Sequence, residues 1–412
     1  LEAAFAPDFS RTTIFTVGEY SPGWYGDATP YFEASWSSRK TATNTSGQGR
    51  VRIPGDYALG NFGGLDGTLY YSSRFIRDTE VAQTRITGGI KGDLPFMDGL
   101  GSLAGWTYDT YVSYSRSNGD DSIQGIAYYP RLEQTLSNTR FDEDSGEYVC
   151  DPRGVAGEGQ QVTCRPLNFF DPTFIMTGRF SDPEDNAYLY PNRITNTVVE
   201  QTTYQGFITG ELFDIGWGGP ASMVLGVEYR DDAIVTKTDA GASGGDFFGY
   251  SGDPGANGSR WLREAFTEFD LPLVLDRKLV SELSLNLAAR WTEEDFFGEE
   301  TTYRVQAQYG PVDWLRFRGT VGTSFRAPNL GEQFGGQVTG FADPLDPCEP
   351  PGVTVPFVDH DDDPNTPDIR LYNPDFETRE QSVIDNCLNG GGPFGLEPTN
   401  PFALGIVGLG TE

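Results

Sequence analysis

The stretch "LSLNLAARWTEEDFFGEETTYRVQAQYGPVDWLRFRGTVGTSFRAPNLGEQF", residues 283–334, decides the fold. From Leu283 to Trp291, apolar side chains stand at every second position, and Ser284, Asn286, Ala288 and Arg290 lie between them. A period of two is the period of a β-strand with two different faces. The pattern returns at 303–309 and again from Leu315, after a short turn at 310–313. The stretch therefore predicts three consecutive strands joined as a meander.

The same alternation occurs along the rest of the chain, whereas helical spacing is hard to find. Aromatic residues make up 13% of the chain and glycine occurs 52 times, which suits an antiparallel β protein with many turns. The further predicted strands carry Phe32, Ala34 and Trp36; Trp106, Tyr108, Val112 and Tyr114; Met223, Leu225, Val227 and Tyr229; and Ala265, Phe269, Leu271 and Leu273.

The two faces of these strands favour a membrane barrel over a soluble sandwich or propeller. Arg, Gln, Glu and Asn recur on the polar face, and Trp, Tyr or Phe end the apolar face. Apolar bands of about 9–11 residues with aromatic ends are typical of transmembrane barrel strands around a polar lumen. Short and long connections also alternate, and the long ones predict outer loops at about 117–197, 231–261 and 329–386.

Charge and hydropathy exclude several classes of protein. There are 29 Lys and Arg against 60 Asp and Glu, a formal net charge of -31, which argues against nucleic-acid binding. No run of about 18 uncharged apolar residues predicts a transmembrane helix. The first residues, "LEAAFAPDF", do not resemble a secretory leader, so we expect a leader to have been removed or the chain to begin within a longer protein.

The four cysteines fall into two local pairs, Cys150 with Cys164 and Cys348 with Cys387. Each lies among Pro, Gly and acidic residues, which predicts disulfide-bonded loops in an oxidising compartment. Metal binding is the competing interpretation, although no CxxC is present. The sequence leaves the connectivity open.

Enzymatic motifs are weak, and we predict no enzyme. The single histidine, His360, lies in an acidic segment, where a Ser/His/Asp triad is hard to build. The segment "GASGG" at 241–245 fits G-x-S-x-G, but the sequence around it does not predict the strand before and helix after that a nucleophile elbow requires.

One acidic loop has the spacing of a calcium site. Asp359, Asp361, Asp363 and Asn365 place oxygen atoms at every second position, as Ca²⁺-binding loops do. Pro364 replaces the usual glycine and Arg370 replaces the usual final acid. A solvated acidic loop is the alternative, and no other cofactor is predicted.

Aromatic residues in the long loops are candidates for ligand contact, because ring faces stack on sugars and on aromatic iron chelators. Such rings also pack a loop on itself, and the sequence does not decide between the two. An anionic ferric chelate would need basic residues such as Arg304, Arg316 and Arg318 to offset the acidic loops. The candidate contacts are Tyr128, Tyr129, Phe247, Phe248 and Tyr250.

Residues 283–334 resemble the late barrel of TonB-dependent outer-membrane receptors: a strand, an outer loop around Phe-Gly, a returning strand, a turn with Pro-Val-Asp-Trp-Leu, and a strand ending in Phe325-Arg326-Ala327-Pro328-Asn329. "GGPASMVLGVEYRDD" at 218–232 and "CRPLNFFDP" from Cys164 are similar to other parts of these barrels. The resemblance covers about residues 12 to 392.

The resemblance implies that residues 1–412 are a barrel fragment of a 22-stranded type, without the plug and last strands. It implies a bacterial outer-membrane location, contact with lipid and lipopolysaccharide, and TonB-driven import of a ferric siderophore, cobalamin or oligosaccharide, the TonB complex acting through the missing plug. An accessory surface protein is a further implied partner. The alternative function is an adhesin or partner-binding platform.

The motif at 325–329 is expected to support wall and plug structurally. Arg326 is expected to face the lumen and pair with acidic groups, and Pro328 to end the strand ladder. An ordinary strand end with an exposed arginine is the alternative.

Overall fold

The computed structural model describes residues 7–101, 103–150, 164–336, 357–358, 369–370 and 380–383. The chain forms two units, Leu1–Thr339 and Gly340–Glu412. In the second unit the described strands are β13 (Phe357–Val358) and β14 (Ile369–Arg370), which pair antiparallel. Every other described strand belongs to the first unit.

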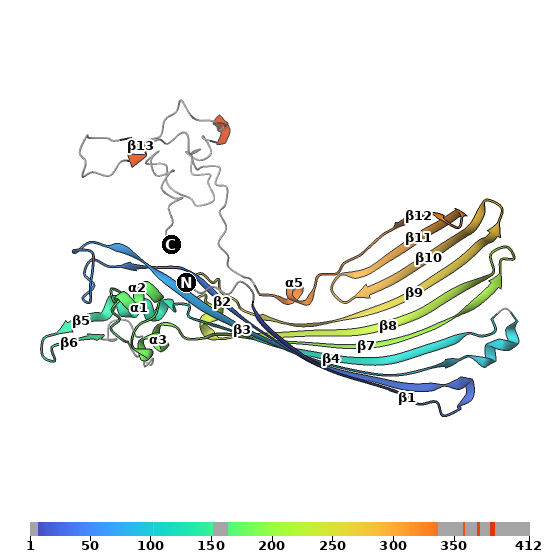
Figure 1. Cartoon of the computed structure of the whole chain (residues 1–412), viewed down its shortest axis with the longest axis horizontal. Coiled ribbons are helices and arrows are strands. Elements are labelled where there is room, and N and C mark those ends of the chain that lie inside the picture. The colour runs from blue at the N-terminus through green and yellow to red at the C-terminus, as the bar shows by residue number, and fades with distance from the viewer. Residues whose placement is uncertain are drawn as a thin grey trace. The chain divides into compact units, whose positions relative to one another are not determined.

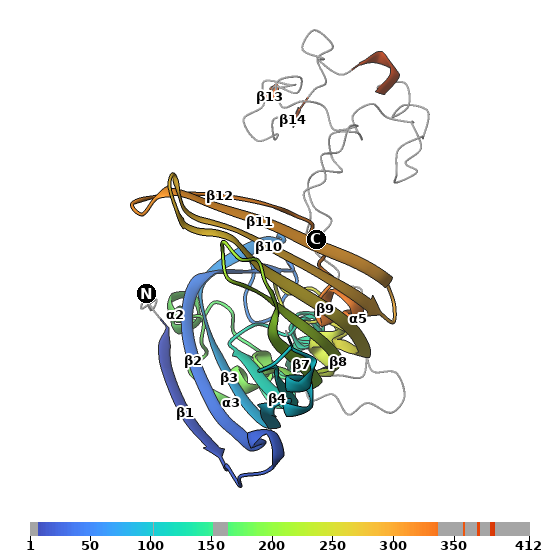
Figure 2. The ribbon, with the colours of Figure 1, turned by 90° about the vertical axis from the view of Figure 1, so that its right-hand side faces the viewer.

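The first unit is built on one antiparallel sheet of ten strands (Figure 1). Neighbours in the sheet are neighbours in the chain, except that β4 pairs with β7 across a long connection. The sheet curves strongly when viewed along its strands (Figure 2). The all-β antiparallel prediction is confirmed. The strands are β1 (Asp8–Glu19), β2 (Thr29–Ile53), β3 (Gly67–Asp93), β4 (Thr107–Gln124), β7 (Arg193–Asp214), β8 (Pro220–Thr238), β9 (Ala256–Arg277), β10 (Val280–Glu294), β11 (Gly298–Val312) and β12 (Leu315–Gly322).

The predicted meander is β10–β11–β12, and its register separates two faces. Leu287 lies opposite Phe269 and Val305, and Val305 lies opposite Val321, so apolar residues form a row across four strands. We call the side of the sheet that carries this row the apolar face and the other side the polar face. Cross-strand rows of this kind are the unit that stabilises a sheet. Edge strand β1 departs from the pattern, because Phe15 and Val17 lie on the polar face.

The strands are longer than a bilayer requires, and their outer parts change character. β2 has 25 residues and β3 has 27, whereas about 9–11 residues cross the hydrocarbon. On the apolar face, β2 carries Pro30 to Trp36 and then only small or polar residues as far as Arg52. On the polar face it ends in buried Val51 and Ile53. We call the part of the sheet with large side chains on its apolar face the apolar band. The part beyond it, from about Ser38 to Ile53 in β2, is the outer extension.

Short turns join the strands at one end of the sheet, on the right in Figure 1. β11 and β12 are joined at Asp313 and Trp314, and β9 and β10 at Lys278 and Leu279. Large apolar side chains in these turns are exposed; Trp314 is 84% exposed and Trp217, between β7 and β8, is 68% exposed. Exposed rings at a strand end match the aromatic girdle of a membrane barrel.

The long connections are shorter than predicted. β4 and β7 are joined by 125–192 in place of 117–197, and β8 and β9 by 239–255 in place of 231–261. The strands continue because their backbone ladders persist, although the apolar alternation has ended. Most of the third predicted loop lies outside the described residues.

Short helices occupy these connections, although the sequence showed no helical periodicity. Two of them, of six and seven residues, are too short for that signal, and caps mark them instead: Asp171 and Asp182 each accept a hydrogen bond from the first turn, and proline follows each. No described helix has the length and apolar character needed to cross a membrane. Between β4 and β7 the elements are α1 (Tyr129–Asn138), β5 (Thr139–Asp142), β6 (Glu147–Cys150), α2 (Pro172–Thr177) and α3 (Pro183–Leu189), and between β8 and β9 the helix is α4 (Ala240–Gly244). Elsewhere, η1 (Tyr25–Asp27) and η2 (Pro95–Leu100) lie in turns, and α5 (Leu330–Phe334) follows β12.

Candidate functional site

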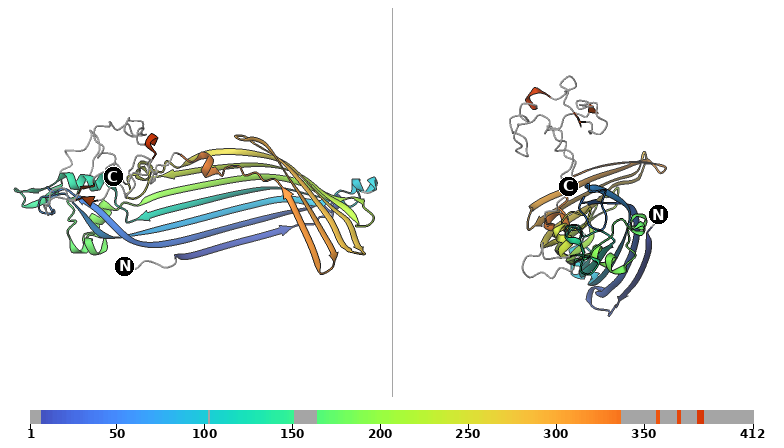
Figure 3. Two further views of the ribbon diagram at one scale, coloured as in Figure 1. Left: turned by 90° about the horizontal axis from the view of Figure 1, so that it is seen from above. Right: turned by 90° about the vertical axis from the view of Figure 1, so that its left-hand side faces the viewer.

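The described residues between β4 and β7, 125–150 and 164–192, fold into a compact loop unit. It lies within the curve of the sheet (Figure 3). Its core packs against the polar-face ends of β2 and β3, and the Tyr57 hydroxyl donates to the Leu167 carbonyl at 2.5 Å. The core residues are Val51, Ile53, Tyr57, Tyr71, Ala127, Leu132, Leu167, Phe169, Phe174, Phe180, Tyr188, Leu189 and Tyr190.

The predicted ligand-contact residues meet where the loop unit joins the connection 239–255. Tyr128 pairs with Phe247 at 5.3 Å between ring centroids, and Tyr129 pairs with Phe248 at 5.7 Å. Tyr128 also donates to Asp246, and Phe247 is only 2% exposed. These rings therefore pack the two connections together. Ligand contact stays a prediction, and among these rings it is best served by Tyr129, which is partly exposed.

Arginines fix the helices of the loop unit. Arg165 donates to Asp185, Glu184 and Asp182 at 2.7, 2.8 and 3.0 Å. Burial raises the pKa of Asp185 even though Arg165 opposes this change. Arg131 lies over Tyr188 at 5.4 Å and donates to the Tyr188 carbonyl. The guanidinium groups here are used for internal structure.

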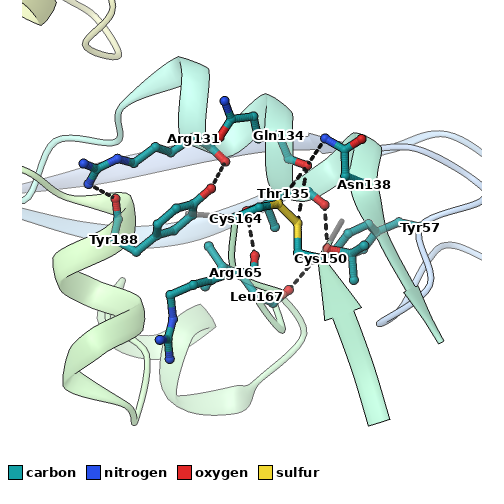
Figure 4. Close-up of a disulfide and its surroundings, with 11 residues drawn as sticks. Tyr57, Arg131, Gln134, Thr135, Asn138, Cys150, Cys164, Arg165, Leu167 and Tyr188 are labelled. Carbon is teal, nitrogen blue, oxygen red and sulfur yellow. Dashed lines mark hydrogen bonds between the residues drawn. A yellow bond between two sulfur atoms is a disulfide. The ribbon is translucent and has the colours of Figure 1, made fainter. Parts of the chain in front are cut away.

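A disulfide between Cys150 and Cys164 ties the end of β6 to the segment before α2 (Figure 4). The two Cα atoms are 5.4 Å apart, and both sulfur atoms lie near the Gln134 carbonyl of α1. This is the local pairing that the loop location favoured. Cys348 and Cys387 lie outside the described residues.

The motif 325–329 lies beyond the end of β12. The strand was expected to continue to about Phe325, but it ends at Gly322. Arg326 makes two hydrogen bonds of 3.1 Å to Glu332, so its acidic partner in this structure belongs to the helix that follows and not to the wall. Pairing with the plug stays a prediction. Asn329 and Glu332 form a capping box for α5. The motif therefore starts a helix, and the spacing Asn-x-x-Glu was its sequence signal.

A buried charged cluster on the polar face was missed by the sequence reasoning. Arg260 of β9 donates to Asp232 of β8 at 3.4 Å and lies 4.0 Å from Glu294 of β10. The same guanidinium donates to the carbonyl of Pro328 at 2.6 Å and to Gln333 at 3.2 Å. Alternation alone would have put the three charges on one face, but their contact depends on register.

A polar hollow of about 540 Å³ lies on the same face, nearer the short turns. Arg304 donates to Glu268 at 3.1 Å and to Asn286 at 2.9 Å. Arg316 pairs with Glu282 at 3.0 Å. Both arginines are thus neutralised by wall carboxylates. The lining consists of Glu268, Asp270, Pro272, Leu275, Glu282, Ser284, Asn286, Arg304, Gln306 and Gln308.

The segment "GASGG" does follow a strand and form a short helix, α4, contrary to expectation. The Ser243 hydroxyl is hydrogen-bonded to Thr238 at 2.7 Å and to the Asp253 carbonyl at 3.4 Å. These are structural partners, and no catalytic base is among them. The chain's one histidine, His360, lies outside the described residues.

Metal binding at the acidic loop stays a prediction. Asp359, Asp361, Asp363 and Asn365 lie outside the described residues. Within the described part of the chain, no three His, Cys, Asp or Glu side chains are grouped closely enough to hold a metal ion.

Comparison with known proteins identifies a family. A family model described as TonB dependent receptor-like, β-barrel matches residues 8–382. No curated protein and no solved structure matches the chain. The matched range contains every strand of the sheet and the loop unit.

Proposed function

The chain belongs to the TonB-dependent receptor-like β-barrels, which are receptors and transporters of the outer membrane, and from this premise we propose that it imports a scarce nutrient by TonB-coupled transport. The apolar face meets lipid and lipopolysaccharide, and the polar face lines the lumen. The TonB complex acts through a plug segment, and the barrel performs no covalent chemistry.

The polar hollow is the observation that supports a substrate class. Arg304, Arg316 and Arg318 were the groups that could have attracted an anionic ferric chelate. Glu268 and Glu282 already pair with the first two, and Arg318 lies opposite Gln308 at the side of the hollow. The remaining lining offers hydroxyl, amide and carboxylate groups. All three kinds of group hydrogen-bond to neutral hydroxylated ligands, and the carboxylates repel anions. The wall therefore favours a neutral, hydroxylated ligand over an anionic ferric siderophore, and we propose an oligosaccharide as the substrate.

Uptake by cells that produce the complete receptor tests both parts of the proposal. Labelled neutral oligosaccharides, a ferric siderophore and cyanocobalamin are offered separately, with and without a functional TonB. We expect oligosaccharide uptake that stops when TonB is removed. Uptake of the ferric siderophore alone would overturn the substrate class, and uptake that continues without TonB would overturn the coupling.

A second function, a partner-binding platform, is favoured by the β5–β6 hairpin. Phe141 and Tyr148 form an edge-to-face pair with centroids 5.2 Å apart, yet they are 50% and 42% exposed. Exposed aromatic pairs are common at protein interfaces. A platform keeps binding its partner, an accessory surface protein or a host surface, in cells without TonB, whereas transport stops.

A further inference from the structure

Residues 323–336, which we call the strap, leave the sheet and turn onto its polar face. Thr323 makes the last contact with β11, where its N–H donates to the Tyr303 carbonyl. The chain then passes through α5, which lies inside the curve of the sheet near β9 (Figure 2). At its end Gly335 bridges to Ala256, and the Gly336 N–H donates to the Gly255 carbonyl. The strap thus spans the tip of β10–β11 and rejoins the sheet at β9.

Arg260 is the main link between the strap and the wall. Its side chain is 9% exposed. One of its nitrogens, Nη1, donates to the Pro328 carbonyl and to Gln333, while Nε donates to Asp232. A planar guanidinium can reach strap and wall at once, which a lysine ammonium does less well.

The wall acids have other partners that do not depend on the strap. Glu294 accepts hydrogen bonds from the N–H groups of Phe296 and Phe297 at 2.9 and 2.8 Å. Asp232 accepts from Gln201 at 2.8 Å. The wall therefore presents a preformed acidic recess for Arg260. The position of the strap depends on the arginine more than the wall does, and a second side-chain link is the 3.4 Å hydrogen bond that Gln333 donates to Glu294.

Apolar packing contributes little to the strap's attachment. α5 has no buried residue. Phe334 lies over Gly258, where an added Cβ would clash with its ring, and its ring centroid is 5.5 Å from that of Phe296. A segment held by a few polar contacts opens at lower free energy than one held by a core.

We propose that the strap is a gate at the outer mouth of the lumen and that Arg260 is the positioning residue that keeps it closed. Closed, the strap covers the polar face beside the outer ends of β8, β9 and β10. Open, it exposes the charged recess around Asp232 and Glu294. The structural part of this proposal does not require transport, and only its gating part rests on the proposed function.

Hydrogen exchange of the complete receptor tests the role of Arg260. In Arg260→Met, we expect the strap amides, including that of Gly336, to exchange at least about tenfold faster. The paired amides of β9 and β10 that lie between Arg260 and the short turn should keep their protection. Arg260→Lys should lie between the two. Unchanged strap exchange in Arg260→Met would overturn the assignment.

The matched control is Arg263→Met. Arg263 is on the same strand but on the apolar face, over Trp261 at 4.3 Å, so its loss should leave strap exchange unchanged. If Arg260→Met does not fold, Gly258→Val supplies a second route, because it displaces Phe334 without unpairing a charge. It should speed strap exchange too, and normal protection there would count against the gate.

A removable cross-link tests whether the strap must move. Cysteines in place of Gly258 and Phe334 should form a disulfide that pins the strap to β9. We expect the pinned receptor to lose nutrient uptake and to recover it on reduction, with the reduced wild type as control. Normal uptake by the cross-linked receptor would show that the strap is not a gate. If the wild type takes up none of the nutrients offered, the transport proposal fails, while the exchange measurement still decides the role of Arg260.

Discussion

The apolar band and the outer extension are made by the same strands, yet their faces have opposite polarity. In the band, Phe32 and Trp36 lie on the apolar face of β2, and Ser35 lies on the polar face between them. In the outer extension Arg50 and Arg52 lie on the apolar face. Val51 lies on the polar face and is buried under the loop unit. The difference teaches that the surroundings of each segment, lipid or water on one side and lumen or loop core on the other, determine the residues on each face.

The largest effect is expected from Phe174→Ala, which would break the outer half of this comparison. Phe174 is fully buried, 4.5 Å from Phe180 and 4.6 Å from Tyr71 between ring centroids. Its loss should lower the opening free energy of the loop unit by about 3–5 kcal/mol. Limited proteolysis of the loop unit measures this. The exposed Phe141→Ala should change it by less than about 0.5 kcal/mol.

The band is tested by Val227→Arg. Val227 is exposed on the apolar face of β8, between Gly206 and Ala265 of its neighbours. A charge facing hydrocarbon should cost about 2–4 kcal/mol in unfolding from lipid vesicles by urea. Gln48→Arg, on the same face of the outer extension, should be nearly neutral. A nearly neutral effect at both positions would show that both regions face water.

The disulfide sharpens the comparison, because only the water-exposed region carries one among the described residues. Cys150 and Cys164 are 14 residues apart. Replacing both with Ser should lower the stability of the loop unit by about 2–3 kcal/mol, mainly through a less restricted unfolded loop. Proteolysis with and without reductant measures it, and reductant should change the wild type but not the variant.

The smallest effect concerns pH and the strap. The Arg326 guanidinium, helped by the Asn329 N–H, lowers the pKa of Glu332 below its ordinary value of 4.5. Because the folded-state pKa is depressed, its stabilisation is present above pH 4.5 and is lost as pH falls through the lowered value. Hydrogen exchange of α5 should accelerate in that range once the intrinsic rate is corrected for. In Glu332→Gln this acid step should be absent; a step that persists would assign it to another carboxylate.

Sequence periodicity predicted the band well and the outer extension poorly. The meander β10–β12 followed from apolar residues at every second position, since one face meets lipid and the other the lumen. Loop limits were misplaced because β4 beyond Tyr114 keeps its ladder while both faces become mostly polar, which removes the signal. The resemblance of residues 283–334 to TonB-dependent receptors was confirmed by the family match.

The site was harder to predict because its contacts join distant positions. Tyr128 and Phe247 were chosen as loop aromatics, but nothing in the sequence shows that they pair with each other. Arg260 bonds Pro328, 68 residues away, and this depends on register and on the path of the strap. Local signals were available for α5, where Asn329 and Glu332 stand three residues apart, and they were overlooked.

The hydrogen bond from Tyr57 to Leu167 has a consequence for biogenesis. It joins a hairpin formed early in the chain to a segment 110 residues later, after β4 has been added. Because the other strands pair with their chain neighbours, sheet growth can proceed hairpin by hairpin, whereas the core around Tyr57 must wait until β2, β3 and β4 are in place. Protease resistance of the loop unit in pulse-labelled cells should therefore appear after the sheet has begun to assemble, and would serve as a clock for maturation at the cell surface.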